Sequence, residues 1–457
     1  MITYQDMQQR LSSGVLLVDF VKQVITDHKN KDDYRLAAVA KEYNEHRNVT
    51  ISQYQKLLYT VSGQAMPDPY AANYKLKTNQ FNRLVTQLNQ YLLGNGVKWE
   101  SEKTKKALGK DFETKLQDAG EIALVQKVAY CFWNKDHMDV FSYLEFAEIP
   151  DEEDGSIKAG VRFWQLAQNK PLRATLYELD GYTEFMWTNG KGEIIQEKRP
   201  YILKVRGTDA DGMEIYGGEN YPGFPIVPFW GNKYKQSEFV GMRENLDAYD
   251  LIKSNYADTV EDCSDIYWLI SNAGGMDDID IQEFMQKLKT THVANVDDGQ
   301  TVQSQTVNIP VEARETLLDR LRSDIYEDFM GLDTKNVADG AVTATQIKFS
   351  YEPMNAKTDK YEYCVLDFLD RFLQIAGLED NATFTRSMIV NTTEEINTVL
   401  AAAQYLPGDY VTRKIMTLFG DGDQVEKALL EMDKEDMGRF GAGGNQEEQT
   451  EDVNNAE

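Results

Sequence analysis

The fold is decided by one stretch of the chain, SEFVGMRENLDAYDLIKSNYADTVEDCSDIYWLIS at residues 237–271. Ser237 is a good N-cap with Glu238 in the first turn, and after Gly241 the stretch contains neither glycine nor proline. Apolar side chains recur at steps of three and four residues: Leu246, Tyr249, Ile252, Tyr256, Val260, Cys263 and Tyr267. This spacing predicts one long amphipathic helix, on the order of 50 Å at about 1.5 Å per residue.

The other side of this predicted helix is acidic. It carries Asp247, Asp250, Asp258, Glu261, Asp262 and Asp265, with only Arg243 and Lys253 to offset them. A second helix is predicted over 311–330, where Leu317, Leu318, Leu321, Ile325 and Phe329 share one side. Residues 272–310 between them predict a compact insert with one helix, near 279–288, and two strand-like runs, 292–296 and 301–309.

Two such helices cannot bury their apolar stripes inside a compact domain of ordinary radius. One solution is side-by-side packing with copies of the same chain in a ring, in which the acidic faces line the lumen. The other is a solvated face on a helix that bridges domains. The periodicity alone leaves both interpretations open.

Upstream of this stretch, residues 1–150 predict mainly helices, with apolar stripes such as Val15, Leu16, Phe20, Val21 and Val24. Residues 161–205 then alternate short strand-like runs with turn signals such as Asp180-Gly181 and Asn189-Gly190, which predicts an antiparallel meander of hairpins. The three prolines in the stretch PGFPIVP (222–228) predict an extended approach to the long helix. The class predicted is α+β, mainly helical.

Downstream, residues 331–343 have no apolar period and predict a loop of a length that favours a functional segment. A third helix is predicted over 344–377, bent at Pro353, followed by a strand over 382–390 and short helices through Met432. The acidic tail at 441–457 lacks apolar content and is predicted to be disordered.

The 457 residues include 48 Lys and Arg against 75 Asp and Glu, for a formal charge of −27. A chain this acidic has no net electrostatic affinity for nucleic acid or an anionic membrane. The sequence shows no signal peptide and no run of about 18 apolar residues, so we expect a soluble intracellular product without membrane contact. Cys131, Cys263 and Cys364 are far apart and predict small buried side chains.

No catalytic pattern is present. The chain lacks a Walker A motif, an HExxH or HxH motif and a G-x-S-x-G motif, and Asp209-Ala210-Asp211-Gly212 reads as a hairpin turn rather than a calcium loop. We therefore expect no enzyme activity, no cofactor and no metal. Two alternatives stay open: a hydrolase that uses a carboxylate pair in the 161–205 sheet, and a ring-forming scaffold protein without a channel.

The order of segments resembles the portal, or head-to-tail connector, proteins of tailed double-stranded-DNA bacteriophages, above all those of long-tailed phages of Gram-positive hosts. The resemblance spans about 50–435. It rests on local phrases in the family's order: NQFNRLV at 79–85 running to YLLG at 91–94 and Val97, PIVPFWGN at 225–232, LDAYD at 246–250 with Ser254 and Asp258, and VTATQIK at 342–348. In the last phrase Val342-Thr343 replaces the family's usual Ser-Gly.

The resemblance implies a ring of twelve copies that forms a DNA channel at one capsid vertex. Residues 1–235 and 344–395 would form the wing, 236–271 and 311–330 the stem, 272–310 the clip, 331–343 the tunnel loop and 396–440 the crown. It implies that the clip docks the terminase large subunit and later a head-completion or adaptor protein. It also implies contacts with the major capsid and scaffolding proteins, a place in the virion, and assembly in the host cytoplasm.

Within that arrangement each residue set acquires an expected role. The stem carboxylates Asp247, Asp250, Asp258, Glu261 and Asp265 would line the channel and repel DNA phosphates, so that double-stranded DNA passes without sequence specificity. Copies would pack through Leu246, Tyr249, Tyr256, Leu317, Leu321 and Ile325. The tunnel loop would present Asp333, Thr334, Lys335, Asn336 and Val337 to DNA, with Lys335 either the one cation that touches it or a solvated surface lysine.

Overall fold

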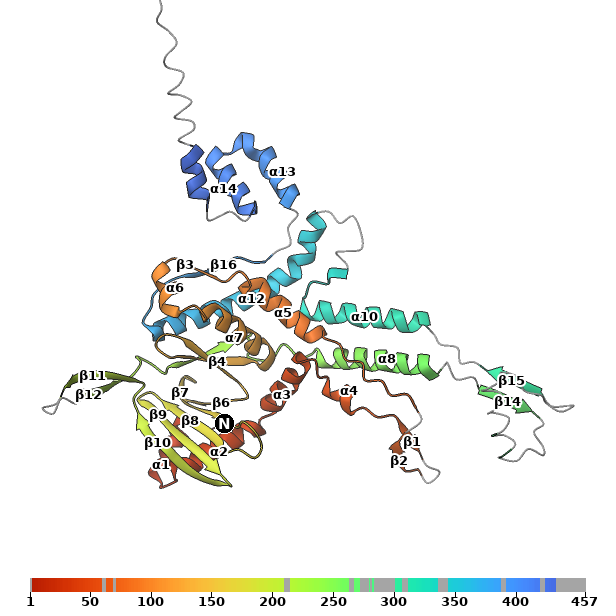
Figure 1. Cartoon of the computed structure of the whole chain (residues 1–457), viewed down its shortest axis with the longest axis horizontal. Helices are drawn as coiled ribbons and strands as arrows, with labels where there is room; N and C mark the ends of the chain where they lie inside the picture. The colour runs from red at the N-terminus through yellow and green to blue at the C-terminus, as the bar shows by residue number, and fades with distance from the viewer. Residues whose placement is uncertain are drawn as a thin grey trace, which may run out of the picture. The chain divides into compact units, whose positions relative to one another are not determined.

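The computed structural model describes residues 2–59, 63–68, 71–208, 214–262, 267–271, 279, 282, 301–305, 311–335, 344–387, 392–419 and 424–432. The chain divides into two compact units. The first contains residues 1–333 and 352–387, and the second contains residues 334–351 and 388–457. Within the described residues the fold mixes helices with six small sheets, all antiparallel (Figure 1).

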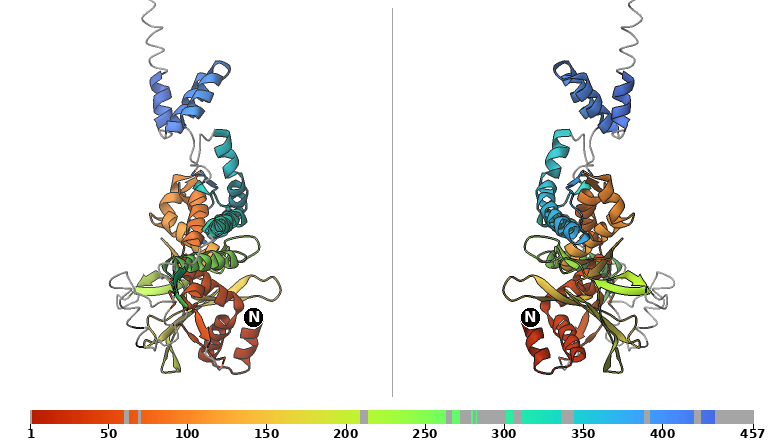
Figure 2. Two further views of the ribbon diagram at one scale, coloured as in Figure 1. Left: turned by 90° about the vertical axis from the view of Figure 1, so that its right-hand side faces the viewer. Right: turned by 90° about the vertical axis from the view of Figure 1, so that its left-hand side faces the viewer.

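The first unit begins with four helices, α1 (Tyr4–Ser12), α2 (Leu17–Asn30), α3 (Asp32–Asn44) and α4 (Val49–Gln53). The first two cover one of its sheets. Thr3 begins α1 through a capping box with Asp6, and the Asn48 side chain caps α4 by accepting from the Ile51 N–H. Phe20, Val21 and Val24 of the predicted stripe are buried against the sheet, whereas Val15 and Leu16 are exposed. Helices α1 and α2 lie beside the strands of this sheet (Figures 1 and 2).

The predicted meander is present and larger than expected. Its order is β10-β9-β8-β7-β6, from strands β6 (Phe146–Pro150), β7 (Ile157–Trp164), β8 (Leu172–Glu178), β9 (Gly181–Thr188) and β10 (Lys191–Arg199). The run at 200–205 does not join this sheet. It lies in β11 (Ile202–Thr208), which pairs with β12 (Glu214–Glu219) in a separate ribbon.

The prediction of mainly helical structure up to residue 150 is wrong from residue 128 onward. A second sheet has the order β13-β4-β5, with strands β4 (Val128–Trp133), β5 (Met138–Ser142) and β13 (Ile226–Trp230). Every residue of β4 is buried, so its side chains show no alternation that would reveal a strand. Strand β13 confirms the extended approach predicted from the prolines.

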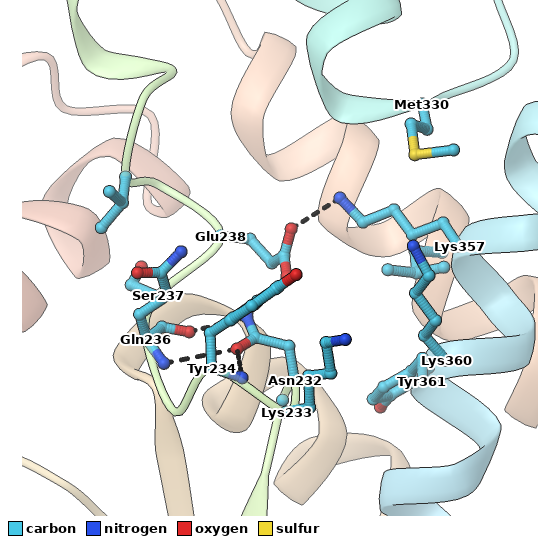
Figure 3. Close-up of a pocket in the computed structure, with 13 residues that line it drawn as sticks. Asn232, Lys233, Tyr234, Gln236, Ser237, Glu238, Met330, Lys357, Lys360 and Tyr361 are labelled. Atoms are coloured by element: carbon cyan, nitrogen blue, oxygen red, sulfur yellow. Dashed lines mark hydrogen bonds and ion pairs between the residues drawn. The ribbon is translucent and has the colours of Figure 1, made fainter.

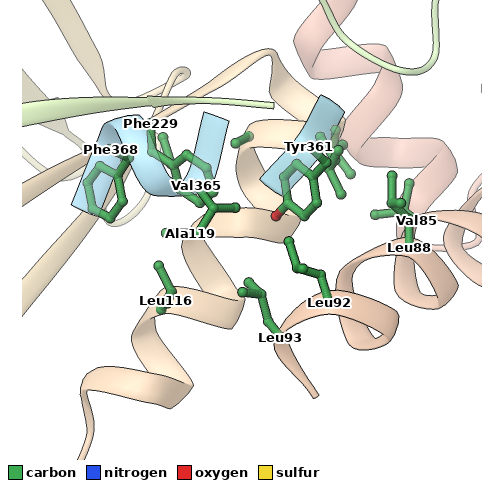
Figure 4. Packing of buried hydrophobic residues seen from close by; sticks show 14 of the residues in the cluster. Val85, Leu88, Leu92, Leu93, Leu116, Ala119, Phe229, Tyr361, Val365 and Phe368 are labelled. Carbon is green, nitrogen blue, oxygen red and sulfur yellow. The ribbon is translucent and has the colours of Figure 1, made fainter. Parts of the chain in front are cut away.

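The main core of the first unit is built by three helices (Figure 4). They are α5 (Gln80–Leu93), α7 (Phe112–Gln126) and α12 (Ala344–Ala376), the last with Pro353 inside it. Leu88 and Leu92 of α5, Leu116 and Ala119 of α7, and Val365 and Phe368 of α12 belong to one buried cluster. Helix α6 (Glu102–Leu108) and the pair β3 (Val97–Trp99) and β16 (Ala382–Phe384) flank it.

The long helix predicted over 237–271 is shorter than expected. Helix α8 spans Arg243–Asp262, 20 residues or about 30 Å, and Tyr267–Ser271 forms strand β14, paired with β15 (Thr301–Gln305). Helix α10 (Val311–Phe329) confirms the second predicted helix. Asn245 pairs with Asp328 and Thr259 with Arg314, so α8 and α10 run antiparallel and carry the β14–β15 hairpin at their far end (Figure 1).

The remaining predicted elements are found in part. The strand over 382–390 is confirmed only for β16, and the short helices appear as α13 (Thr392–Ala402), the 3-10 turn Ala403–Tyr405, α14 (Gly408–Phe419) and a helix over 425–432. Cys131 is buried and Cys364 half-buried. Cys263, residues 292–296, most of the helix near 279–288 and the tail at 441–457 lie outside the described residues.

Gly120 of α7 gives a test of the close packing in this core. A Cβ on Gly120 would collide with the Tyr361 hydroxyl and with Oδ1 of Asn89, two groups joined by a buried hydrogen bond of 3.0 Å. We expect Gly120→Ala to lower the free energy of unfolding by about 1–3 kcal/mol, as overpacking does. The control is Gly408→Ala at the start of α14, where a Cβ would meet no atom within 4 Å. Urea unfolding that ranks the two variants equally would contradict the packing described.

Candidate functional site

One face of α8 holds an extended segment of the chain, residues 74–78, which we call the strap. Asp258 Oδ1 accepts from the Tyr74 N–H at 2.7 Å, Ser254 Oγ from the Leu76 N–H at 3.0 Å, and Asp250 Oδ1 from the Thr78 N–H at 3.1 Å. Side chains four residues apart on a helix are separated by about 6 Å along its axis, and alternate residues of an extended chain by about 6.6 Å. The spacing of the side chains along α8 therefore matches the spacing of alternate backbone amides along the strap. Asp250, Ser254 and Asp258 can each accept from one of these amides.

Asp250 is the most heavily bonded member of this row. Besides the Thr78 N–H it accepts from the Thr78 hydroxyl at 2.7 Å and from Asn48 Nδ2 at 2.9 Å, and it is 2% exposed. Burial raises the pKa of Asp250 above its ordinary 3.8, although these hydrogen bonds oppose the shift. Since the folded state then binds the proton more tightly, this group stabilises the fold most below pH 3.8, and that contribution is lost as the pH rises through the raised pKa.

The other carboxylates near the strap are also engaged. Asp258 is 1% exposed and lies 3.0 Å from Lys56 Nζ. Asp247 is half-buried and accepts from the Tyr43 hydroxyl and from Asn48 Nδ2. Glu261 is exposed and hydrogen-bonds the Tyr74 hydroxyl, which raises the pKa of that tyrosine.

These contacts correct the expected channel lining. Asp250 and Asp258 are buried against the strap of their own chain, so they cannot face an aqueous lumen in this conformation. Glu261, by its exposure, stays a candidate, while Asp247 is partly covered and Asp265 lies outside the described residues. Most of the exposed carboxylates of the helix pair lie on α10, a helix that was predicted from its apolar residues alone. They are Glu312, Glu315, Asp319, Glu327 and Asp328.

The expected subunit-packing residues also divide. Leu246 and Ile325 are 2% and 0% exposed and belong to the main core of their own chain, so the prediction that they meet another copy is wrong. Tyr249, Tyr256 and Leu321 are half-buried. Leu317 is 46% exposed and remains available to a neighbour.

The start of the predicted tunnel loop is tied to the helix pair. Asp333 Oδ1 accepts from Arg322 at 2.7 Å, and Gln87 of α5 bonds both the N–H and the C=O of Leu332 at 3.0 Å. Thr334 and Lys335 are exposed. Asn336 and Val337 lie outside the described residues, so the role expected of this loop stays a prediction.

A lysine that the sequence analysis missed joins the base of the helix pair to α12 (Figure 3). Lys357 Nζ lies 2.6 Å from Glu238 Oε2, donates to the Phe329 C=O at 2.9 Å, and sits over the Phe329 ring at 3.5 Å. Burial lowers the pKa of Lys357, and Glu238 opposes that shift. A cation on the last carbonyl groups of α10 is favourable because the C-terminal end of a helix is negative.

The described residues around this base also line an open pocket of about 200 Å³, among them Tyr234, Val240, Met330 and Tyr361. Across the parts of the chain that the structure describes, no three His, Cys, Asp or Glu side chains come together as a possible metal site. Nor does any helix in those parts combine the length and the apolarity that crossing a membrane requires.

Comparisons with known proteins agree on one family. Residues 23–438 match the model of the family described as phage portal protein, SPP1 Gp6-like. A portal protein of Clostridium phage phiCD119 is 26% identical over 265 residues, which cover 55% of this chain and 57% of that relative. A portal protein of Bacillus phage SPP1 is 22% identical over 389 residues, which cover 77% of this chain and 74% of that relative.

Among solved structures, the chain is similar to one from the virion of a native gene transfer agent particle, with a TM-score of 0.46, 10% identity, and coverage of 74% of this chain and 89% of that one. A chain from the neck of the native particle, computed with C12 symmetry, has a TM-score of 0.43 and 11% identity, with 82% of this chain and 98% of that one covered. The match to the Clostridium phage relative spans little more than half of that protein's length.

The strap can be tested at Asp250. In Asp250→Ala the Thr78 N–H and the Asn48 amide lose a buried acceptor, so we expect a loss of roughly 2–4 kcal/mol in the free energy of unfolding. Hydrogen exchange at the Tyr74, Leu76 and Thr78 amides should accelerate at the same time. Glu244→Ala, an exposed acidic position in the first turn of the same helix, is the matched control and should change stability by less than about 1 kcal/mol. Unchanged exchange at the three amides in Asp250→Ala would refute the strap.

Proposed function

This chain belongs to the SPP1 Gp6-like family of phage portal proteins, and from that premise we propose that twelve copies form a ring at one vertex of a phage capsid. Double-stranded DNA would be packaged, retained and ejected through the centre of this ring. The observation that carries the proposal is the antiparallel pair α8 and α10 with the β14–β15 hairpin at its far end, which lies inside the stretch that matches the family.

The elements fit the following assignment. Residues 1–235 and 344–395 form the wing, α8 and α10 the stem, and residues 396–440 the crown. The clip begins at Tyr267 rather than at residue 272, because β14 pairs with β15 and so belongs with the insert. Residues 331–343 form the tunnel loop, in which Lys335 is the candidate cation for contact with DNA.

The partners follow from the position of each part in such a ring. The clip would dock the terminase large subunit during packaging and a head-completion or adaptor protein afterwards. The wing and the crown would contact the major capsid and scaffolding proteins. Assembly would take place in the host cytoplasm, and the finished ring would be part of the virion.

The family is structural rather than catalytic, which supports at family level the expectation that the chain is not an enzyme. No described group of residues favours the hydrolase alternative over this one. A scaffold ring without a channel differs from a portal in one measurable property, which is whether the ring has a central opening.

The lining of the channel is reassigned from α8 to α10. Carboxylates repel DNA phosphates effectively only where they face the lumen and lack cationic partners. Glu312 and Glu315 are exposed near the clip end of α10, whereas Asp250 and Asp258 are buried and Asp258 is paired with Lys56. We therefore assign to the exposed α10 carboxylates the role of keeping the duplex away from the wall.

The assembly itself gives the first test. Purified protein viewed by negative-stain electron microscopy should show perforated rings of about twelve subunits. Light scattering of the same sample should give a mass near that multiple of 52.2 kDa. A protein that stays monomeric at all concentrations would contradict the portal, and closed particles without an opening would favour the scaffold alternative.

The channel charge gives the second test. Wild-type rings should not retain linear double-stranded DNA, whereas Glu315→Lys/Asp319→Lys rings should retain it with an affinity that falls steeply as salt rises, because bound counterions are released. The control is Glu193→Lys/Glu197→Lys on β10, which makes the same charge change at exposed positions far from the helix pair. If both variants retained DNA equally, the retention would follow from the net charge of the ring alone, and the assignment of the α10 carboxylates to the lumen would be wrong.

A further inference from the structure

The hairpin formed by β1 (Leu57–Tyr59) and β2 (Ala65–Pro67) is left uncovered by the parts of the chain that the structure describes. All six of these residues are exposed, and Leu57, Leu58, Tyr59 and Met66 expose 50%, 45%, 68% and 45% of their surface. An isolated two-stranded hairpin is at best marginally stable in water. Apolar side chains gathered at such a place mark an interaction surface. We call residues 54–59 and 63–68 the arm.

The base of the arm is held in place by contacts with α8 and with its own flanks. Lys56 Nζ lies 3.0 Å from Asp258 of α8, and the Asp68 N–H donates to the Lys56 C=O at 2.9 Å. Lys75, next to the first bonded residue of the strap, donates to the Tyr54 C=O and lies over the Tyr54 ring. The arm is therefore a continuation of the strap, presented beside the far half of α8 (Figure 1).

The far half of the helix pair also exposes apolar side chains. Val260 of α8 is 53% exposed, and Val311 and Leu317 of α10 are 41% and 46% exposed. Thr259 and Arg314 bond each other across the pair at 2.9 Å, so these three residues lie at the same level along it as Asp258, where the arm is attached. Both uncovered apolar surfaces therefore occupy one level of the molecule.

A ring brings such surfaces together. In a closed ring the contacts are heterologous, so one face of each copy meets a different face of the next, at the same height along the axis. Charge favours the match. The far half of the pair exposes Glu261, Glu312 and Glu315, whereas β1 and β2 contain no Asp or Glu and the one carboxylate of the arm, Asp68, lies at its base beside Lys56, so the two strands can approach this acidic surface without repulsion.

We propose that the arm of one copy packs its apolar side chains onto Val260, Val311 and Leu317 of the next copy in the ring. This inference rests on the proposed function, since it names the surface through which the ring closes. Each arm then reaches from the α8 to which it is strapped to the helix pair of its neighbour. A second copy of the chain covers what the single chain leaves in water.

The test uses Leu58→Glu/Tyr59→Glu in the full chain, because neighbouring strand residues point to opposite faces and both faces are then charged. We expect the concentration for half-maximal ring assembly, measured by light scattering, to rise at least tenfold. Leu317→Glu should act in the same direction. The control is Leu166→Glu, where a leucine 87% exposed between β7 and β8 is changed in the same way, and it should assemble like the wild type.

A charge-paired variant ties the two surfaces together. Tyr59→Glu combined with Leu317→Lys should recover assembly relative to either single variant, a result that general misfolding would not give. Independently of stability, Tyr59→Cys/Leu317→Cys rings should oxidise to a ladder of cross-linked multimers on non-reducing gels, which either cysteine alone should not form. The ladder keeps the proposal testable if the glutamate variants fail to fold.

The outcomes separate this inference from the portal itself. Wild-type rings together with normal assembly of Leu58→Glu/Tyr59→Glu would overturn the arm contact and leave the portal proposal standing. An absence of cross-linked multimers in the double-cysteine rings would do the same. A wild-type chain that never forms rings would overturn both.

Discussion

The helix pair depends on one requirement, that the backbone N–H groups of residues 74–78 have acceptors where they are covered by α8. A buried amide without a partner costs about as much as a lost hydrogen bond. Asp250, Ser254 and Asp258 meet the requirement because a helix repeats every four residues at nearly the distance at which an extended chain repeats every two. The placement of α8, and with it α10 and the arm, follows from that match.

This requirement also explains why the acidic face was misread from the sequence. Carboxylates are rarely buried without a partner, so a row of them on a helix reads as a solvated surface. Here the partners are backbone amides some 170–185 residues earlier in the chain, which leave no trace in composition or charge. The one local sign of this burial is Ser254, a short polar side chain in the same row as Asp250 and Asp258. A solvated helix face more often carries long charged side chains at such a position.

The elements that could be predicted are those whose burial is one-sided and local. The stripes of α5, α10 and α12 and the glycine-bearing turns of the meander are of this kind. Strand β4 could not be predicted because it is buried on both faces, and the end of α8 could not because the run Tyr267–Ser271 pairs with Thr301–Gln305. A long-range pairing there overrides an apolar period that continues past the true end of the helix. For the candidate site, the sequence located the helix pair but did not reveal that Asp250 and Asp258 of α8 are buried.

The two helices of the pair therefore use their charge differently. On α8, Asp258 forms an ion pair with Lys56, and Asp250 accepts hydrogen bonds from Asn48 and Thr78 of the same chain. On α10, Glu312 and Glu315 remain in water. For a channel that must pass DNA without holding it, the relevant quantity is then the unpaired charge at the wall rather than the formal −27 of the chain. Under the proposed lining, substitutions on α8 would change how firmly the helix pair is held and substitutions on α10 would change how DNA passes, because stability and conduction would rest on different carboxylates.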